Sequence, residues 1–258
     1  MTIRCVYTDL DGTLLGRGGS LFRTADGAFT LLAARALEAC HRAGAEVVIK
    51  SGRRRAQVME DARLMGQESY IFEMGAGVVV DGELTFLTGE LQPEEGVSVH
   101  EQVERTGAPA LLLERLGDRL EPYLPWSRGR EVSHLFRGRV DAAEASRLLA
   151  SAGHSNLRFV DNGETEDGTH SYHLLPVAVS KAGAVEAHMR ARGYAPHECI
   201  AVGDSPEDLE VAAVVGRLFL VANAPAAAAP HLPNVERTEA EMSEGFYEAV
   251  IRALAESR

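Results

Sequence analysis

The sequence predicts an α/β protein in which a parallel sheet is interrupted by a smaller α+β domain. Short apolar runs alternate with amphipathic helical patterns near both ends of the chain, which is typical of a parallel sheet covered by helices on both faces. Between about residues 85 and 175 this alternation weakens, and charged residues and glycine become more frequent. We therefore expect one domain formed by residues 1–84 and 177–258, with a second domain, residues 85–176, inserted into it.

The N-terminal part of the first domain is expected to alternate strands with helices. Apolar runs bounded by turn residues predict strands, and a 3.6-residue apolar period that stops at glycine predicts helices. The elements expected here are a strand at Cys5–Thr8, a helix at Ala28–Ala43, a strand at Glu46–Lys50, a helix at Arg54–Met65, a strand at Tyr70–Glu73 and a hairpin at 78–86 around an Asp-Gly turn.

The same reasoning predicts the remaining elements. In the inserted domain we expect a helix near Pro109–Leu120, a strand near Ser133–Phe136, a helix at Ala142–Ala152, and strands near Leu157–Val160 and Tyr172–Leu175. After it we expect a helix at Lys181–Arg192, a strand at Cys199–Val202, a helix at Glu207–Val215, a strand at Leu218–Ala222, a short helical turn at 225–230 and a helix at Glu239–Ala255.

Composition and charge exclude several classes of partner. The 258-residue chain has a formal net charge of -12, which argues against nucleic-acid binding and against anionic membrane surfaces. No apolar run approaches the roughly 20 residues that span a bilayer. The strand pattern begins by about residue 3, so we expect no secretory signal and a cytoplasmic location. Cys5, Cys40 and Cys199 show no metal-ligand spacing and are interpreted as reduced packing residues.

Two aspartates follow the first predicted strand, in the stretch DLDGT at residues 9–13. Residues i and i+2 of an extended segment point the same way, so Asp9 and Asp11 should face one spot beyond the carboxyl end of the strand. Ligands bind at that edge of open α/β sheets. Gly12 and Thr13 form the following turn and present backbone N–H groups to the same place. Taken alone, the stretch is also compatible with a capped turn and solvated carboxylates.

Two further loops end strands of the same predicted sheet. Ser51 and Gly52 follow the second strand, where a hydroxyl and backbone N–H groups at a helix start can hold an anion, although an ordinary N-cap region has the same composition. The stretch GDSPEDLE places Asp204 at a strand end and Asp208 four residues later. Together with the two aspartates above, these carboxylates predict a hard cation with oxygen ligands, most naturally Mg²⁺.

Lysine is rare in this chain. Of 26 basic residues, only Lys50 and Lys181 are lysine, so a compact ammonium is used where arginine is the norm. Lys181 is expected to open a helix, where a cation gains nothing from the helix dipole. A role in balancing the carboxylates and contacting the anion explains its position better than a role in the helix.

In order along the chain, DLDGT at 9–13, Ser51, Lys181 and GDSPED at 203–208 resemble the four motifs of the haloacid-dehalogenase (HAD) superfamily of phosphatases. The inserted domain resembles the large α/β cap of the Cof-type and sugar-phosphate phosphatase branch, which includes mannosyl-3-phosphoglycerate and sucrose-phosphate phosphatases. The resemblance implies a Rossmann-like parallel-sheet core with an inserted α+β cap domain.

The resemblance also implies roles for the motif residues. Asp9 would be the nucleophile that forms an aspartyl-phosphate, and Asp11 the general acid and then the general base. Ser51 and Lys181 would hold phosphoryl oxygens, with Lys181 also restraining Asp9. Mg²⁺ would be bound by Asp9, the backbone carbonyl of Asp11 and Asp204, with Asp208 as a ligand or as support.

Other candidate phosphate contacts are less distinctive. Thr13 and Gly52 lie in the motif loops, and Arg53 is the best placed of three consecutive arginines. Asn223 lies in an Asn-Ala loop like that of the family, although a simple turn would look the same. The family often has Glu-Asn-Gly after the third strand, whereas this chain has Met74 in place of the asparagine, which puts a substrate contact in doubt.

Histidines in the inserted domain do not predict a metal site. His170 and His173 lie three residues apart on a predicted strand, so they should point to opposite faces. One of them, or His134 or Arg137, is a candidate substrate contact, and the sequence does not choose among them.

We therefore predict a Mg²⁺-dependent phosphomonoester hydrolase that acts on a small phosphorylated metabolite. A sugar phosphate or a phosphorylated glycoside such as a glycosyl-3-phosphoglycerate fits the resemblance best. The alternatives are a phosphotransferase or phosphomutase that uses the same aspartyl-phosphate, and a catalytically silent binding protein with the same fold. The partner expected is the small-molecule substrate, and the oligomeric state is a monomer or a homodimer.

Overall fold

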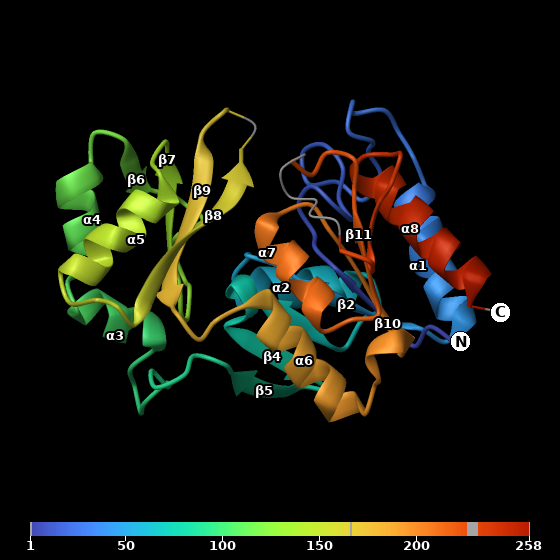
Figure 1. The fold of residues 1–258 in the computed structure, drawn as a ribbon, viewed down its shortest axis with the longest axis horizontal. Coiled ribbons are helices and arrows are strands. Elements are labelled where there is room, and N and C mark those ends of the chain that lie inside the picture. The colour runs from blue at the N-terminus through green and yellow to red at the C-terminus, as the bar shows by residue number, and fades with distance from the viewer. Residues whose placement is uncertain (1, 166, 226–231, 258) are drawn as a thin grey trace.

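The protein consists of a core domain and a cap domain, each built on its own β-sheet (Figure 1). The computed structural model describes residues 2–165, 167–225 and 232–257. This arrangement confirms the predicted α/β class with a parallel sheet and an inserted α+β domain. Apart from Pro225, the helical turn expected at 225–230 lies outside the described residues.

The core sheet has eight strands. In chain order they are β1 (Cys5–Thr8), β2 (Glu46–Lys50), β3 (Tyr70–Phe72), β4 (Gly77–Val80), β5 (Glu83–Phe86), β10 (Cys199–Gly203), β11 (Arg217–Leu220) and β12 (Val235–Arg237). Their spatial order is β12-β11-β10-β1-β2-β3-β4-β5, parallel as far as β3, with β4 and β5 antiparallel. Because β1 lies between β2 and β10, the loops after these three strands meet at one edge.

Helices cover both faces of the core sheet. On one face lie α1 (Leu32–Ala43), α2 (Arg55–Leu64) and α8 (Met242–Glu256); on the other lie α6 (Lys181–Arg192), α7 (Pro206–Leu209) and the 3-10 helix η3 (Glu210–Ala213). Alternate side chains of β2 point to opposite faces of the sheet. Val47 and Ile49 pack into the hydrophobic cluster with α1, and Val48 packs into the cluster with α6. Burial on both faces explains why the parallel strands are apolar throughout.

The cap carries a four-stranded antiparallel sheet with helices on one side. Its elements are α3 (Val99–Arg105), α4 (Ala108–Leu116), β6 (Leu120–Pro122), β7 (His134–Gly138), α5 (Ala142–Ser151), β8 (Leu157–Glu164) and β9 (His170–Pro176), with the strand order β6-β7-β9-β8. Phe136, Phe159 and Tyr172 pack with Leu112 and Leu149 of the helices. The helices lie on the outer side, so the sheet lies between them and the core (Figure 1).

Several elements differ from the sequence expectation. The first helix starts at Leu32 rather than Ala28, because the preceding residues form a loop in which Thr30 N–H donates to Phe22 O and Thr24 N–H donates to Ala28 O. The helix expected at 207–215 is split into α7 and η3. The sequence did not predict α3, β6 or β12, of which the latter two are strands of only three residues, nor the 3-10 helices η1 (Glu73–Gly75) and η2 (Pro196–Glu198).

The predicted domain boundaries remain a proposal. β5 still belongs to the core sheet and ends at Phe86, whereas β9 of the cap sheet ends at Pro176. Besides the two covalent connections of the chain, side-chain contacts join the two domains. Arg158 of β8 forms an ion pair of 2.8 Å with Glu207 of α7, which fixes one end of the cap sheet over the core.

The cysteines have the role expected of them. Cys5, Cys40 and Cys199 are free and buried, which confirms their interpretation as reduced packing residues. Among the described residues, none of the helices combines the length and the apolar character needed to cross a bilayer.

We predict that buried His134 makes stability fall in mild acid. Burial, and then the neighbouring His100 ring 3.8 Å away, lower the pKa of His134 from 6.5 to about 4. Between pH 6.5 and about 4, His134 is therefore protonated in the unfolded chain and neutral in the folded protein. Above pH 6.5 this histidine leaves the free energy of unfolding unchanged. As the pH falls from 6.5 towards 4, the free energy of unfolding decreases, by about 2 kcal/mol between pH 7.5 and pH 5.

Urea unfolding at pH 7.5 and pH 5 of the wild type and of His134→Gln measures this effect. The variant should lose about 2 kcal/mol less than the wild type over that interval. His197→Gln, which replaces an exposed histidine, is the matched control and should keep the wild-type slope. Equal slopes for wild type and His134→Gln would contradict the prediction.

Candidate active site

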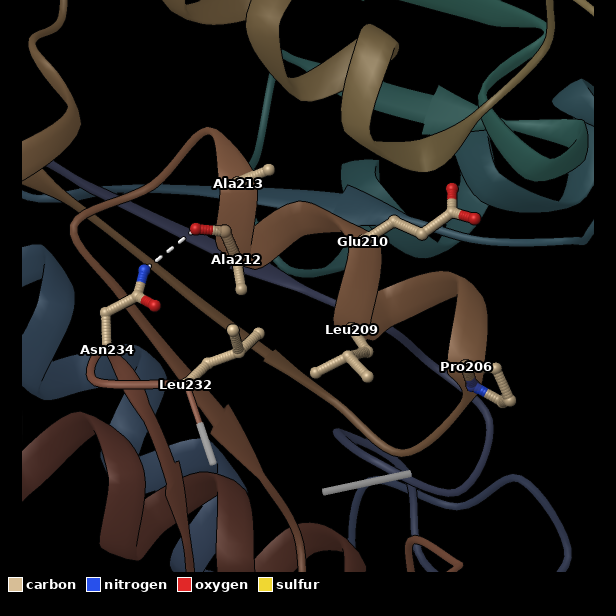
Figure 2. Close-up of a pocket in the computed structure, with 7 residues that line it drawn as sticks. All are labelled: Pro206, Leu209, Glu210, Ala212, Ala213, Leu232 and Asn234. Atoms are coloured by element: carbon tan, nitrogen blue, oxygen red, sulfur yellow. Dashed lines mark hydrogen bonds between the residues drawn. The ribbon is translucent and has the colours of Figure 1, made fainter. Parts of the chain in front are cut away.

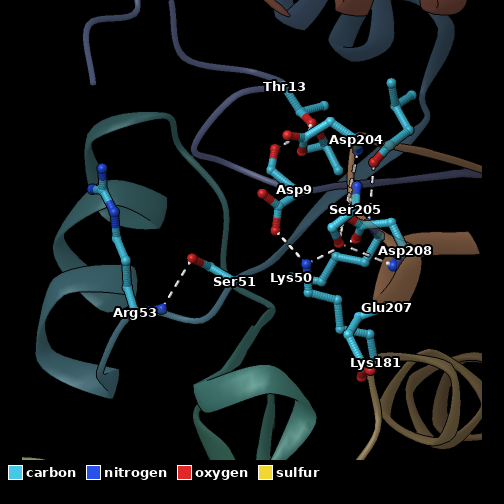
Figure 3. Close-up of polar contacts among 12 residues, drawn as sticks. Asp9, Thr13, Lys50, Ser51, Arg53, Lys181, Asp204, Ser205, Glu207 and Asp208 are labelled. Carbon is cyan, nitrogen blue, oxygen red and sulfur yellow. Dashed lines mark hydrogen bonds and ion pairs between the residues drawn. The ribbon is translucent and has the colours of Figure 1, made fainter. Parts of the chain in front are cut away.

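Three carboxylates from distant parts of the chain meet at the carboxyl edge of the core sheet. Asp9 follows β1, Asp204 follows β10 and Asp208 lies on α7; one oxygen from each lies within 4.8 Å of the others (Figure 3). The pairing of β1 with β10 produces this meeting, since Thr8 lies opposite Val202 and Asp9 N–H donates to Val202 O.

The loop after Asp9 folds closely over Asp204. Gly12 has a φ of +81°, and a Cβ atom at this position would lie 2.5 Å from Asp204 Oδ2, so only glycine fits. The Thr13 hydroxyl donates to Asp204 Oδ1 at 2.8 Å. The DGT part of the first motif therefore orients a carboxylate of the fourth motif, and the predicted phosphate contact of Thr13 remains a prediction.

Both lysines of the chain lie in this cluster. Lys181 Nζ is 2.7 Å from Asp9 Oδ1 and 2.9 Å from Asp208 Oδ1. Lys50 Nζ is 2.5 Å from the same Asp208 oxygen and 3.1 Å from Val202 O. Both ammonium groups are buried. Sequence reasoning assigned no role to Lys50, although its place at the end of β2 and the scarcity of lysine were signals that could have found it.

The charges of the cluster do not balance. Burial raises the pKa of Asp9 to about 6, opposed by Lys181, and raises that of Asp204 to about 7, with further increases from Asp9 and Asp208. For Asp208 burial also raises the pKa, but Lys181 and Lys50 outweigh it and the net shift is downwards. Burial lowers the pKa of Lys50, whereas Asp208 and Asp9 overcome burial and raise that of Lys181.

This donor set fits a hard divalent cation. Asp9 and Asp204 are carboxylates whose negative charge lacks full compensation, and oxygen ligands of this kind are those that Mg²⁺ prefers. Asp208 is already saturated: Oδ1 accepts from both lysines, and Oδ2 accepts from the hydroxyl and the N–H of Ser205 at 2.6 and 3.2 Å. Its contacts suit a supporting residue that holds the lysines better than a direct ligand.

Asp11 does not join the carboxylate cluster. β1 ends at Thr8, so the extended geometry that would point Asp9 and Asp11 in one direction is lost. The Asp11 carboxylate binds Arg53 in a bidentate pair, with Nε–Oδ2 and Nη2–Oδ1 distances of 2.8 and 2.6 Å. Arg53 also binds Asp61 at 2.8 Å. Arg53 thus joins the first motif to the second.

The loop after β2 carries the other predicted phosphate contacts. Ser51 is buried, and its hydroxyl accepts from Arg53 N–H at 3.1 Å, so Ser51 and Arg53 lie together beside the cluster (Figure 3). The described contacts of Asn223 are with the backbone: its Nδ2 donates to Gly12 O at 2.9 Å, and its Oδ1 accepts from Met242 N–H at 2.9 Å. Asn223 therefore ties the first motif loop to the start of α8.

The cap reaches this loop at Gly52. A Cβ atom on Gly52 would lie 3.0 Å from both His173 Nε2 and Asn162 Nδ2, and 3.1 Å from Met74 Sδ. Met74 itself has a left-handed backbone, with φ 64° and ψ 21°. Asparagine tolerates this conformation better than methionine does.

The other cap candidates lie elsewhere. His170 pairs with Asp161 at 2.8 Å, Arg137 pairs with Glu121 at 2.6 Å, and His134 stacks on His100. Of the four side chains named from the sequence, the described contacts place His173 alone beside a motif loop.

A hollow of about 390 Å³ lies beside α7 and η3 (Figure 2), and none of the predicted site residues lines it. It is lined by Pro206, Leu209, Glu210, Ala212, Ala213, Leu232 and Asn234. The lining is mostly apolar, and Asn234 Nδ2 donates hydrogen bonds to the backbone carbonyls of Ala212 and Val215. We therefore assign the chemistry to the carboxylate cluster and not to this hollow.

A second group of ligand-type side chains lies at the opposite edge of the sheet. Atoms of Cys5, Glu46 and His188 lie within 4.8 Å of one another. The Glu46 carboxylate already accepts from Ser69 and Arg192 and from the Tyr194 hydroxyl, so this group is a buried hydrogen-bonded network.

Comparison with known proteins places these motifs in a family. Residues 148–250 match the family model for haloacid dehalogenase-like hydrolases. A phosphoglycolate phosphatase of Halorubrum lacusprofundi is 31% identical over 221 residues, which cover 85% of this chain and 85% of that protein.

Solved structures share the fold over nearly the whole chain. A crystal structure from Thermoplasma acidophilum has a TM-score of 0.71 at 18% identity and covers 98% of this chain and 99% of its own. The sucrose-phosphatase of Synechocystis, solved with sucrose and phosphate, has a TM-score of 0.67 at 14% identity and covers 98% of both chains. At these identities the structures establish the fold alone, with core and cap together.

We predict that Lys50 is required for folding stability as well as for the site. Lys50→Met leaves the buried Asp208 carboxylate with one lysine instead of two, and breaking a buried pair in this way should cost about 3–5 kcal/mol. Arg42→Met, which breaks an exposed pair with Glu38, is the matched control and should cost less than about 1 kcal/mol.

Urea unfolding of both variants measures the difference, and Lys50→Met combined with Asp208→Asn should recover part of the loss, since it removes the uncompensated charge. A loss in Lys50→Met no larger than that in Arg42→Met would show that the buried pair does not stabilise the fold.

Proposed function

Since the chain belongs to the haloacid dehalogenase-like hydrolases and is a phosphatase of the Cof-type branch, we propose that it hydrolyses a small phosphorylated metabolite through an aspartyl-phosphate on Asp9, with Mg²⁺ as cofactor. One observation carries this proposal: Asp9, Asp204 and Asp208 converge around Lys181 at the carboxyl edge of the sheet.

Asp9 is the nucleophile because one of its oxygens is held and the other is available. Lys181 fixes Oδ1, and within the described residues no hydrogen bond engages Oδ2. Oδ2 attacks phosphorus, the new P–O bond forms, and the ester P–O bond breaks. Asp11, which takes up a proton from solvent once the phosphate displaces it from Arg53, gives that proton to the leaving oxygen. Asp11 then takes a proton from a water molecule that attacks phosphorus, which releases Asp9 and inorganic phosphate.

The metal would be held by Asp9, Asp204 and the backbone carbonyl of Asp11. When bound, Mg²⁺ supplies the positive charge that offsets the repulsion between these carboxylates and the phosphate dianion. Asp208 keeps both lysines in place, and Lys181 and Ser51 hold phosphoryl oxygens.

Arg53 has two alternative anions to bind. In the described contacts it is paired with Asp11, which draws this carboxylate away from the cluster. A phosphate dianion that enters beside Ser51 competes for the same guanidinium, because arginine binds phosphate and carboxylate by the same bidentate geometry. Substrate binding then frees Asp11 to act as acid and base.

The substrate is proposed to be a sugar phosphate or a phosphorylated glycoside, such as a glycosyl-3-phosphoglycerate. The likeness of fold to a sucrose-phosphatase, cap included, supports this class. A second candidate is phosphoglycolate, which the name of the relative at 31% identity favours. A phosphotransferase or phosphomutase would use the same Asp9 and would yield a new phosphate ester instead of free phosphate. We also propose a cytoplasmic location and a monomeric or homodimeric state.

We predict that phosphate release from an aryl phosphate requires both Mg²⁺ and the Asp9 carboxylate. Asp9→Asn should lower kcat at least about 1,000-fold, because the amide cannot form the acyl phosphate, and excess EDTA should abolish release until Mg²⁺ is restored. The measurement is inorganic phosphate released per enzyme, with circular dichroism to check folding. A folded Asp9→Asn protein with normal turnover would falsify the nucleophile assignment.

We predict that Arg53 contributes to phosphate binding. Arg53→Ala removes a charge-assisted hydrogen-bonding group, so the inhibition constant for inorganic phosphate should rise about 10–100-fold. Arg55→Ala is the matched control, because Arg55 pairs with Glu131 at 2.7 Å instead of with Asp11. Inhibition by phosphate at the wild-type level in Arg53→Ala would assign Arg53 to holding Asp11 alone.

A further inference from the structure

The proposed phosphate-binding loop, residues 51–53, is held by donors to all three of its carbonyl oxygens. Met74 N–H donates to the first carbonyl and Glu73 N–H to the third, at 3.0 and 2.9 Å. The middle carbonyl, that of Gly52, accepts from Arg130 Nη1 at 2.9 Å. The first two donors belong to the core, whereas Arg130 belongs to the cap, between β6 and β7. The cap thus holds one peptide group of a core loop.

The Arg130 side chain is buried and fixed by further contacts. Besides Gly52 O, its Nη1 donates to Ser133 Oγ at 3.0 Å, and its Nε donates to Trp126 O at 3.1 Å. Both hydrogens of Nη1 and the hydrogen of Nε therefore have acceptors. Because the guanidinium group is planar, it cannot turn away from Gly52 without disturbing the other two hydrogen bonds. The contact with Gly52 is thus a fixed part of the junction between the domains.

The positive charge of Arg130 has a counterpart in the same junction. Burial lowers the pKa of Arg130, and the buried Glu73 carboxylate opposes this shift. The Ser133 hydroxyl connects the two side chains, since its oxygen accepts from Arg130 and its hydrogen is donated to Glu73 Oε2 at 2.9 Å. The guanidinium group stays charged, and hydrogen bonds from charged donors are stronger than those between neutral groups.

Fixing the Gly52 carbonyl also fixes the N–H group of Arg53. The C=O and N–H groups of a trans peptide point in opposite directions, so Arg53 N–H is directed away from Arg130. It donates to Ser51 Oγ at 3.1 Å. The hydroxyl hydrogen of Ser51 has no acceptor among the described residues, so it remains available for a phosphoryl oxygen.

The Gly52 N–H group is a second available donor of this loop. Ser51 O accepts from Met74 N–H, so the N–H group of the same peptide, that of Gly52, points away from Met74. Within the described part of the chain no hydrogen bond engages it. A hydroxyl and a backbone N–H group side by side, at the start of a helix, are suited to bind an anion.

We propose that Arg130 is a positioning residue for phosphate binding, which holds the Gly52 carbonyl on the cap side and so keeps the Ser51 hydroxyl and the Gly52 N–H group ready to donate to a phosphate. Without Arg130 the peptide between Gly52 and Arg53 can turn over, because glycine tolerates many backbone conformations. A carbonyl oxygen would then lie beside Ser51 Oγ and repel the anion. The inference rests on the proposed function, in which Ser51 holds a phosphoryl oxygen, and adds that docking of the cap and binding of phosphate favour each other.

The phosphate affinity of Arg130 variants tests the proposal. Arg130→Met removes the donors and keeps an apolar stem, so the inhibition constant for inorganic phosphate, with an aryl phosphate as substrate, should rise about 10–50-fold. KM for the aryl phosphate should rise by a similar factor, and kcat should change less than about threefold, because the loop binds the phosphoryl group before and during its transfer. Arg130→Lys, whose ammonium group can donate to one carbonyl, should restore part of the affinity.

Arg54→Met is the matched control. Arg54 also joins core and cap, since its Nη1 donates to Arg128 O at 2.6 Å, and its loss removes the same charge close to the loop. The inhibition constant of this variant should stay within about twofold of the wild type. Equal constants in wild type and Arg130→Met, or equal increases in Arg130→Met and Arg54→Met, would overturn the proposal. A wild-type protein that phosphate does not inhibit would instead overturn the proposed function.

Hydrogen exchange in the wild-type protein tests the proposal without a substitution. The N–H groups of residues 131–133 donate to Glu73, so their exchange reports whether the cap is docked. Because coupling between two equilibria is reciprocal, saturating inorganic phosphate with Mg²⁺ should slow their exchange at least about fivefold, and should slow the amides of α4, on the outer side of the cap, less. Unchanged exchange at 131–133 would overturn the proposal even if Arg130→Met did not fold.

Discussion

The ion pairs of Asp208 with two buried lysines are the interaction on which the rest of the site depends. Lys50 comes from β2, Lys181 from α6 and Asp208 from α7, so one carboxylate oxygen joins three elements that are far apart in the sequence. Charges so deeply buried are stable only when they are paired, and the pairs therefore fix these elements relative to β1. The same pairs place an ammonium group against Asp9.

This arrangement also leaves an excess of negative charge that supports the proposed metal site. Asp208 forms ion pairs with both lysines. Asp9 and Asp204 therefore retain negative charge that is not fully compensated and that burial makes unfavourable. The divalent cation proposed for this site would offset this excess and the charge of a phosphate dianion. The ion pairs that stabilise the fold thus also set the charge of the proposed metal site, so a change at Lys50 or Lys181 should alter both.

A second constraint positions the cap. Glu73 and Met74 have left-handed backbones, at φ 47° and 64°, and this turn directs the buried Glu73 carboxylate at the backbone of 131–133 in the cap. The strain of two such residues is offset by four hydrogen bonds to one carboxylate. Because Ser133 is among the partners, the turn that holds the cap also orients His173 over the loop at Gly52.

The sequence by itself determined the α/β class, most core elements and the family, because apolar periodicity and four short motifs are local properties. Only the tertiary structure decided that Lys50 lies in the cluster, that Asp11 turns to Arg53, and that His173, unlike His170, reaches a motif loop. Short strands such as β6 and β12 were not predicted from the sequence, because three residues show too little periodicity. Pairing with neighbouring strands holds them in place. Local patterns fix which face a residue occupies, whereas contacts between distant segments fix which partner it finds.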